Sequence, residues 1–112
     1  MRANRKADLG RFADPVLLIL ISLAAGPAHG YAMGEDIAAF SGTTLQPGTL
    51  YGALERLERR GWIAPLEAEE RRHPYRLTDA GIEALQAKLA TIGRIGATGA
   101  QRVSAKPSAE VG

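Results

Sequence analysis

The sequence predicts a mainly α-helical protein with one small β-hairpin, and three observations lead to this prediction. Apolar residues recur at helical spacing in four segments, most of them bounded by capping residues or glycines. Two short runs of apolar and aromatic residues lie between the third and fourth of these segments. The chain has 112 residues, which is enough for one domain, and it contains no cysteine. Disulfides, thiolate zinc sites and cysteine nucleophiles are therefore excluded.

The first helix is predicted over Pro15–Ala25. Asp14 precedes it as an N-cap, and proline fits the first helical turn because the N–H that it lacks has no partner there. Gly26 and Pro27 end the segment. Because it is apolar on every side, we expect this helix to be central and covered by other elements. It is about half as long as the ~20 residues that span a bilayer, so the sequence indicates no membrane segment.

Two further helices are predicted over Tyr31–Phe40 and from Pro47 to about Arg60, the latter closing on Gly61 as a C-cap. The leucines of the later helix recur every three or four residues and form one narrow inward face: Leu50, Leu54 and Leu57. Two short strands, at 62–66 and 75–77, then flank the charged loop Glu67–His73.

A fourth helix is capped at Thr78-Asp79 and extends at least to Ile92. The order of three helices, a strand, a loop, a strand and a last helix is that of a winged helix-turn-helix domain. We therefore expect a basic arm at 1–12, a winged helix-turn-helix domain at 13–78, a C-terminal dimerisation helix at 79–95 and a disordered tail at 96–112. The tail is rich in Gly, Ala and Ser, which favours disorder.

The formal net charge is only +2, but the charges are segregated along the chain. The charged residues within 1–12 are mainly basic. Residues 13–54 contain no Lys or Arg, and basic residues return from Arg56 onwards. Such segregation can build the positive face that nucleic acid requires. Glutamates interleave with the second basic cluster, so ordinary solvated surface charge is the alternative.

Several short motifs follow one another in the chain: HGY at 29–31, PGTLY at 47–51, LERLE at 54–58, GWI at 61–63 and YRLTDAG at 75–81. In this order they resemble the PadR family of bacterial transcriptional regulators, over roughly Val16 to Leu89. The resemblance implies a dimeric repressor whose third helix enters the major groove and whose wing lies along the phosphates. The wing departs from the family pattern, since it contains no glycine and Pro74 precedes Tyr75.

With its leucines inward, the third helix presents six residues on its outward half: Gly48, Thr49, Gly52, Glu55, Arg56 and Arg59. The N-terminal part of a recognition helix meets base edges, where Gln46 suits adenine and the methyl group of Thr49 suits thymine. Tyr51 is either a boundary aromatic or a DNA contact, and the resemblance favours the contact. The predicted DNA-binding residues are Tyr31, Thr44, Gln46, Gly48, Thr49, Tyr51, Gly52, Arg56, Arg71 and Arg72. The two arginines at the wing tip suit phosphates, with a hydrated hairpin tip as the alternative.

The last helix carries apolar residues at spacings of three, four and three, the pattern of a paired helix. We therefore predict a homodimer with the interface residues Val16, Ile19, Leu20, Ile82, Leu85, Leu89 and Ile92. A helix lying on its own domain is the alternative. In the short branch of the family a cavity between protomers admits flat aromatic ligands, held by an aromatic residue of the last helix. No aromatic residue follows Tyr75 here, which disfavours that kind of site but leaves a small-molecule effector open.

The sequence thus predicts a cytoplasmic repressor that binds double-stranded DNA as a homodimer. The alternative is a winged-helix module for protein–protein contacts without DNA. No nucleophile motif or phosphate-binding glycine loop is present, and His29 and His73 fit no metal-ligand pattern. No secretory signal is evident. We therefore expect no enzymatic activity, no cofactor, no metal site and no membrane partner.

Overall fold

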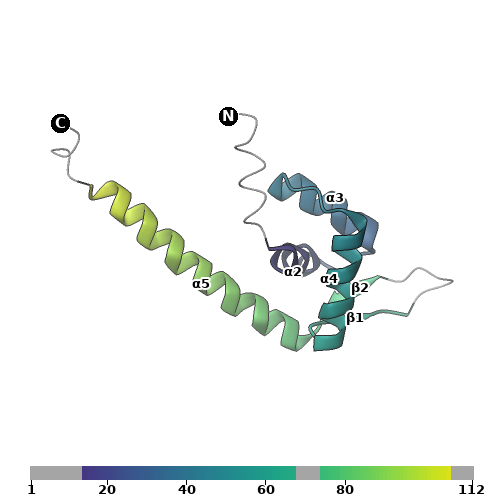
Figure 1. Ribbon diagram of the computed structural model, residues 1–112. Coiled ribbons are helices and arrows are strands. Elements are labelled where there is room, and N and C mark those ends of the chain that lie inside the picture. The colour runs from purple at the N-terminus through teal and green to yellow at the C-terminus, as the bar shows by residue number, and fades with distance from the viewer. Residues whose placement is uncertain (1–13, 68–73, 107–112) are drawn as a thin grey trace.

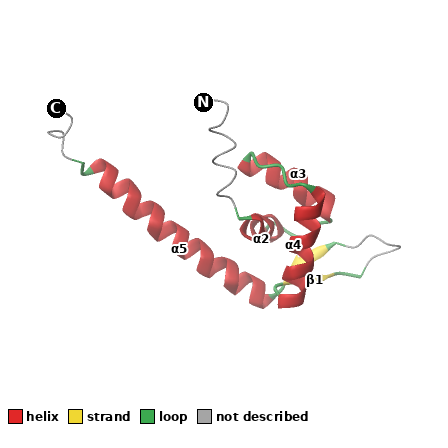
Figure 2. Cartoon of the chain, viewed as in Figure 1, coloured by secondary structure: helices red, strands yellow, loops and turns green. Residues whose placement is uncertain are grey.

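The computed structural model describes residues 14–67 and 74–106. Within these ranges the elements are α2 (Pro15–Ala24), α3 (Gly30–Ser41), α4 (Pro47–Arg60), β1 (Ile63–Pro65), β2 (Tyr75–Leu77) and α5 (Asp79–Ser104). Figure 1 shows a body formed by α2, α3, α4 and the hairpin, with α5 leaving it as a long arm. Helices dominate the described chain (Figure 2). This confirms the predicted class, mainly α with a small β-hairpin, in the winged helix-turn-helix order.

Helix α2 lies at the centre of the body, as its apolar sequence predicts. The Asp14 carboxylate accepts a hydrogen bond of 3.0 Å from the backbone N–H of Val16, and Pro15 is the first helical residue. Helices α3, α4 and α5 all pack against α2. Ile19 and Leu20 are fully buried as a result. No helix in the described part of the chain is both long and apolar enough to cross a membrane.

Helices α3 and α4 form the helix-turn-helix pair. Met33 and Ile37 of α3 and Leu54 of α4 are buried in the same core. The Ser22 hydroxyl donates a 2.8 Å hydrogen bond to the Asp36 carboxylate, which ties α2 to α3. Helix α4 ends at Gly61, whose φ of 79° lies in the left-handed region that favours glycine.

The hairpin is antiparallel, with Ile63 opposite Leu77 and Pro65 opposite Tyr75. Backbone hydrogen bonds of 3.1 and 2.9 Å also join Ala28 to Tyr75, so the segment between α2 and α3 adds a bridge to the hairpin. A bridge of one residue leaves no pattern in a sequence, and this one was not predicted. It holds the hairpin against the helix-turn-helix.

The root of α5 is packed directly on the turn that follows α4. The Thr78 hydroxyl accepts a hydrogen bond from the N–H of Gly81 at 3.1 Å and donates one to the Gly61 carbonyl at 2.6 Å. A Cβ atom on Gly81 would fall well inside contact distance of the Trp62 carbonyl oxygen. Only glycine allows α5 to approach the turn this closely.

Helix α5 corrects the predicted boundary of the tail. We expected disorder over 96–112, but the helix continues unbroken to Ser104; residues 107–112 lie outside the described part, as does the predicted basic arm at 1–12. Gly93, Gly96 and Gly99 each cost about 1 kcal/mol relative to alanine, yet the intervening residues sustain the helix. At 1.5 Å per residue α5 is about 39 Å long. Every described residue from position 89 onwards is exposed.

Candidate nucleic-acid interface

The starts of α3 and α4 surround one groove on the surface of the helix-turn-helix. Its volume is about 330 Å³, and Tyr31, Tyr51 and Thr44 are among the residues that line it. The side chains of Tyr31 and Tyr51 are 73% and 53% exposed. Three of the predicted DNA-binding residues are therefore brought together from three segments of the chain. We call this feature the tyrosine groove.

The ring of Tyr51 rests on the first residue of α3. A Cβ atom on Gly30 would lie 2.6 Å from the Tyr51 hydroxyl oxygen and 2.8 Å from its Cε1 and Cζ atoms. One side of the ring is thus packed while the rest remains open to solvent, so Tyr51 lies at the boundary that the sequence analysis left undecided. The role of Gly30 was not predicted, although its place in the HGY motif was the available signal.

The outer face of α4 carries the other predicted contacts. Gln46, Gly48 and Thr49 are exposed at its start, and a side chain at Gly48 would meet no other atom within 4 Å. Further along, an Arg56 guanidinium nitrogen lies 3.8 Å from where a Cβ of Gly52 would be. The Arg56 side chain therefore extends back along the helix, toward its N-terminal half.

The neighbouring arginines on α4 make contacts within the molecule. Arg59 pairs with Glu55 at 3.6 Å, and both side chains are exposed. The guanidinium of Arg60 lies 5.1 Å from the centre of the Trp62 ring, a cation–π arrangement. Among the described arginines on this helix, Arg59 and Arg60 thus have recorded partners, whereas the Arg56 guanidinium extends over Gly52.

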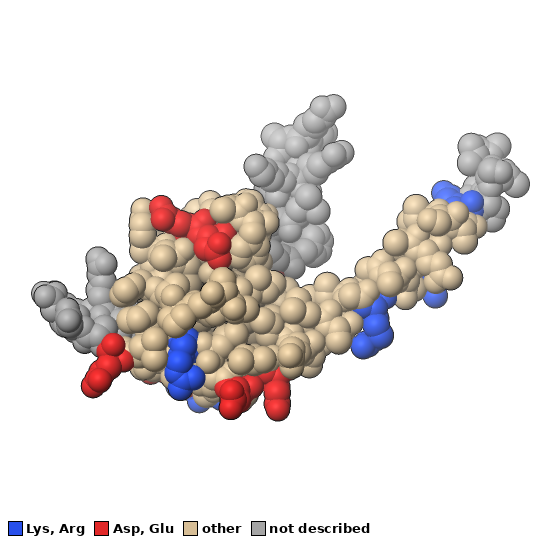
Figure 3. Space-filling view, turned by 180° about the vertical axis from the view of Figure 1, so that it is seen from behind, with Lys and Arg blue, Asp and Glu red and all other residues tan. Residues whose placement is uncertain are grey.

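Backbone polarity at this surface favours anions, whereas one side chain opposes them. Neither His29 nor Gln46, the N-cap residues of α3 and α4, makes a side-chain capping hydrogen bond, so the first N–H groups of both helices keep free donors. Against this, Glu35 lines the tyrosine groove. The hydrogen bond with Glu35, and then the negative charge of that carboxylate, raise the pKa of the Tyr31 phenol. Figure 3 shows acidic side chains over α3 and basic side chains along α5.

The wing contributes less to the described surface. Arg71 and Arg72 lie outside the described residues. The exposed Arg76 of β2 donates a 3.1 Å hydrogen bond from its Nη1 to the Leu77 carbonyl. Burial and then the charge of Glu58 raise the pKa of the Tyr75 phenol on the same strand.

The predicted dimer residues fall into two groups. Ile19 and Leu20 are buried in the core of their own domain, and Leu85 is only 6% exposed. The structure leaves these three residues little or no surface for a partner, because α3, α4 and α5 of the same chain cover α2 and Leu85 of α5 packs into the same core. Val16 is half-buried, and three residues of α5 stay exposed on one helical face. We call these the apolar stripe: Ile82, Leu89 and Ile92. Ile95 and Val103, which were not predicted, are also exposed beyond it.

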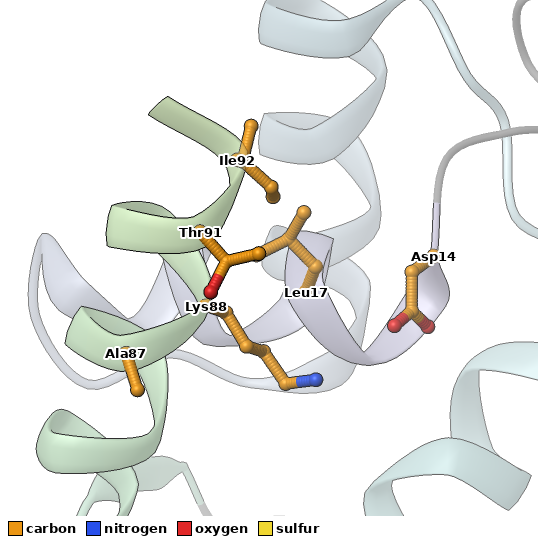
Figure 4. Close-up of a pocket in the computed structure, with 6 residues that line it drawn as sticks. All are labelled: Asp14, Leu17, Ala87, Lys88, Thr91 and Ile92. Atoms are coloured by element: carbon orange, nitrogen blue, oxygen red, sulfur yellow. The ribbon is translucent and has the colours of Figure 1, made fainter. Parts of the chain in front are cut away.

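Two hollows flank the contact between α2 and α5. One, of about 420 Å³, is lined by Asp14, Leu17, Ala87, Lys88, Thr91 and Ile92 (Figure 4). The other, of about 460 Å³, lies between the end of α2, β2 and the first turns of α5, and includes Leu23, Leu77 and Leu89. Among the described residues, no group of three or more His, Asp or Glu side chains could hold a metal ion.

Comparisons with known proteins agree with the fold. A protein of transposon Tn4556 from Streptomyces fradiae is 45% identical over 85 residues, which make up 76% of this chain and 25% of that protein. The transcriptional activator GvpE of Haloferax mediterranei is 39% identical over 67 residues, 60% of this chain and 34% of GvpE. The chain thus spans about a quarter to a third of these relatives. A PadR family transcriptional regulator from Eggerthella lenta superimposes with a TM-score of 0.69 at 27% identity, covering 95% of this chain and 94% of that one.

The model of the transcriptional regulator PadR-like family matches residues 18–87, which is more than half of the chain. This range runs from the core of α2 through the helix-turn-helix and the hairpin into α5. The family consists of transcriptional regulators and not of enzymes, in agreement with the absence of catalytic motifs from the sequence. The chain belongs to the PadR-like family of transcriptional regulators, as its motifs indicate.

Proposed function

We propose that this regulator binds double-stranded DNA sequence-specifically through the α3–α4 surface, as a cytoplasmic homodimer that represses transcription. The observation that carries the proposal is the outer face of α4. Its start is exposed at Gly48 and Thr49, and the two glycines at 48 and 52 add no side chain there, while Arg56 extends back over Gly52. A helix with such a face can approach base edges closely.

The chemistry of this face fits the major groove. The Gln46 amide can bond adenine in bidentate fashion, and the Thr49 methyl group can pack on a thymine methyl. Arg56 extends toward the same half of α4 and can reach guanine or a phosphate. The Tyr51 hydroxyl and the uncapped N–H groups of α3 are suitable donors to phosphate oxygens, and the Tyr31 hydroxyl would join them by exchanging its hydrogen bond with Glu35 for one to a phosphate.

The apolar stripe on α5 supports the homodimer. Its three side chains are each 41–46% exposed, and a water-exposed row of this kind gains free energy when a second copy covers it. The helix beyond position 92 has no packing partner within the described chain, and an isolated helix with three glycines is weakly stable in water. Pairing of two α5 helices would also place two α4 helices for two half-sites.

An effector is proposed to bind beside this interface. The hollow of Figure 4 combines apolar walls from Leu17 and Ile92 with the charged groups of Lys88 and Asp14, a composition suited to a small amphipathic molecule. Ile92 belongs both to this hollow and to the apolar stripe. A ligand bound here would therefore be able to alter the packing of the two α5 helices.

A salt-dependent mobility shift on the DNA upstream of the protein's own gene tests the function. We expect a specific complex that survives mixed-sequence competitor and weakens steeply with salt. Transcription from the bound promoter in vitro should fall when the protein is added; a rise would make it an activator, which is what GvpE is named for. An intact dimer that binds no DNA even at low salt would favour the protein-interaction module instead.

A further inference from the structure

We propose that the tyrosine groove binds a small organic cation with an apolar or aromatic body, and that this ligand competes with DNA. The groove lies between α3 and the start of α4, away from both hollows along α5. Its chemistry differs from theirs, because two exposed phenol rings and one carboxylate line it. The competition, unlike the ligand binding, rests on the proposed DNA-binding function.

Apolar groups shape the groove. Leu45, Pro47 and the buried Leu50 supply apolar surface on the α4 side. On the α3 side, Gly34 keeps the space open, because a Cβ atom there would be 3.9 Å from a methyl carbon of Leu50. The resulting volume of about 330 Å³ can take a ligand with a single ring.

The charge of the groove selects a cation. Glu35 is the charged side chain that lines it, and the ion pair recorded among the described residues involves Glu55 and Arg59, not Glu35. No Lys or Arg occurs between residues 13 and 54, the stretch that supplies all of α3 and the start of α4. On the side of the molecule seen in Figure 3, the acidic side chains over α3 have no basic side chain among them.

The two phenol rings strengthen this preference. The face of a tyrosine ring attracts a cation electrostatically, and here two tyrosines and a carboxylate line the same groove. Tyr51 is held in place by its contact with Gly30, which limits the rotamers that a ligand would otherwise have to order. A phosphate, in contrast, would have to enter the groove beside the negatively charged Glu35 carboxylate. In this proposal, DNA phosphates therefore contact the rim of the groove, and a cation occupies its interior.

Occupancy of the groove is expected to oppose DNA binding. Tyr31, Thr44 and Tyr51 line the groove and also belong to the predicted DNA-binding set. A ligand that engages both phenol rings withdraws these donors from the phosphates.

Titration calorimetry on the full chain with benzyltrimethylammonium tests the ligand site. We expect saturable binding, with benzyl alcohol and phenylacetate binding at least about tenfold more weakly, since neither offers a cation. Glu35→Gln keeps the shape of the side chain and removes its charge, so it should weaken binding of the cation by about tenfold. Glu55→Gln is the matched control on the outer side of α4 and should leave the affinity unchanged.

Nuclear magnetic resonance locates the bound cation. Shifts should concentrate on the Tyr31 and Tyr51 rings and be absent at Leu17 and Ile92, which mark the hollow of Figure 4. Equal affinity for benzyl alcohol, unchanged binding by Glu35→Gln, or shifts confined to Leu17 and Ile92 would each overturn the site.

The competition is measured separately, at an ionic strength matched with NaCl because DNA binding depends on salt. Benzyltrimethylammonium at a concentration equal to its wild-type dissociation constant should weaken DNA binding by the wild type about twofold and by Glu35→Gln only about 1.1-fold, since the variant binds the cation about tenfold more weakly. Ligand binding without any loss of DNA affinity would refute the competition alone. If the protein binds no DNA, the proposed function fails, while calorimetry still decides whether the groove binds cations.

Discussion

The absence of a Cβ atom at two glycines allows elements of this domain to pack closely. At Gly81 the missing side chain lets α5 touch the Trp62 carbonyl, and at Gly30 it lets the Tyr51 ring lie on the start of α3. Gly30 belongs to the HGY motif and Gly81 to the YRLTDAG motif. Each glycine matters because its missing side chain lets a neighbouring group make contact with the backbone.

Replacing Gly81 by alanine should destabilise the domain by about 3 kcal/mol, because the added methyl group meets a backbone carbonyl that cannot move aside cheaply. Urea unfolding followed by the fluorescence of Trp62, the one tryptophan of the chain, measures this. Gly93→Ala is the matched control. Its methyl group meets nothing within 4 Å, so the variant should be as stable as the wild type or up to about 1 kcal/mol more stable. Equal effects at both positions would contradict the close contact.

The contact between Gly30 and Tyr51 predicts non-additive effects on DNA binding. Gly30→Ala should displace the ring and weaken the complex, whereas the same change in a Tyr51→Ala background should have little further effect, because the colliding ring is gone. A double-mutant cycle of dissociation constants measures this coupling. Additive losses would show that Gly30 acts independently of Tyr51.

Arg56 and Arg59 offer a matched pair for testing the DNA-binding face. Arg56→Ala should weaken binding and reduce the slope of log affinity against log salt by about 0.9 if one phosphate contact is lost. Arg59, already paired with Glu55, should change neither quantity when replaced by alanine. A reversed result would move the contact face around α4.

Among the elements, α5 has two different halves. Its first part packs on α2 and β2, with Leu85 in the core, whereas the part from position 89 onwards is exposed throughout. The spacing of its apolar residues suggested one continuous partner-facing row. In the structure, Leu85 turns toward the body and the residues on either side of it remain free for a partner.

Leu89→Asp together with Ile92→Asp should give monomers, because two charged pairs would face each other at the proposed interface. Sedimentation velocity measures the effect. Ala90→Asp with Ala97→Asp introduces the same charges at exposed positions that lie roughly 100° around the helix from the apolar stripe, and should leave the dimer intact. Leu85 is unsuitable for this test, because its replacement by Asp would disrupt the core of the domain itself. A monomeric wild type at high concentration would remove the dimer altogether.

At the scale of the whole molecule, most of the fold follows from local signals in the sequence. Prolines and N-cap residues marked where the helices begin, and Gly61 marked where α4 ends, because these residues act on adjacent backbone. The burial of Ile19 and Leu20 did not follow, since an apolar helix does not reveal whether its own chain or a partner covers it. The length of α5 was missed because glycine content alone argued for disorder.

The candidate site was predictable only in part, for the same reason. The outward face of α4 could be derived from helical periodicity. The tyrosine groove joins three segments, so its volume and the approach of Tyr51 to Gly30 depend on tertiary packing, whereas Tyr31 and Glu35 are neighbours one turn apart on α3. Which residues line such a groove can be known only from the folded structure.

The proposed dimer implies a defined geometry for the DNA operator that it would bind. Two inverted half-sites should have their centres about 34 Å apart along the duplex, or a multiple of that distance, so that both α4 helices meet the same face. Inserting five base pairs between the half-sites should abolish tight binding in a mobility-shift assay, and inserting ten should restore part of it. Indifference to both insertions would indicate that each protomer binds alone.

The tight joint at Thr78 and Gly81 has a consequence for how such a regulator can diverge. The Thr78 hydroxyl bonds both Gly61 and Gly81, and the Trp62 carbonyl lies against Gly81. These contacts fix the direction in which α5 leaves the helix-turn-helix body. In the proposed dimer, substitutions at the far end of α5 would therefore change the spacing of the two helix-turn-helix bodies without disturbing either body. DNA contact and half-site spacing would then vary independently, because the Thr78–Gly81 contact stays the same.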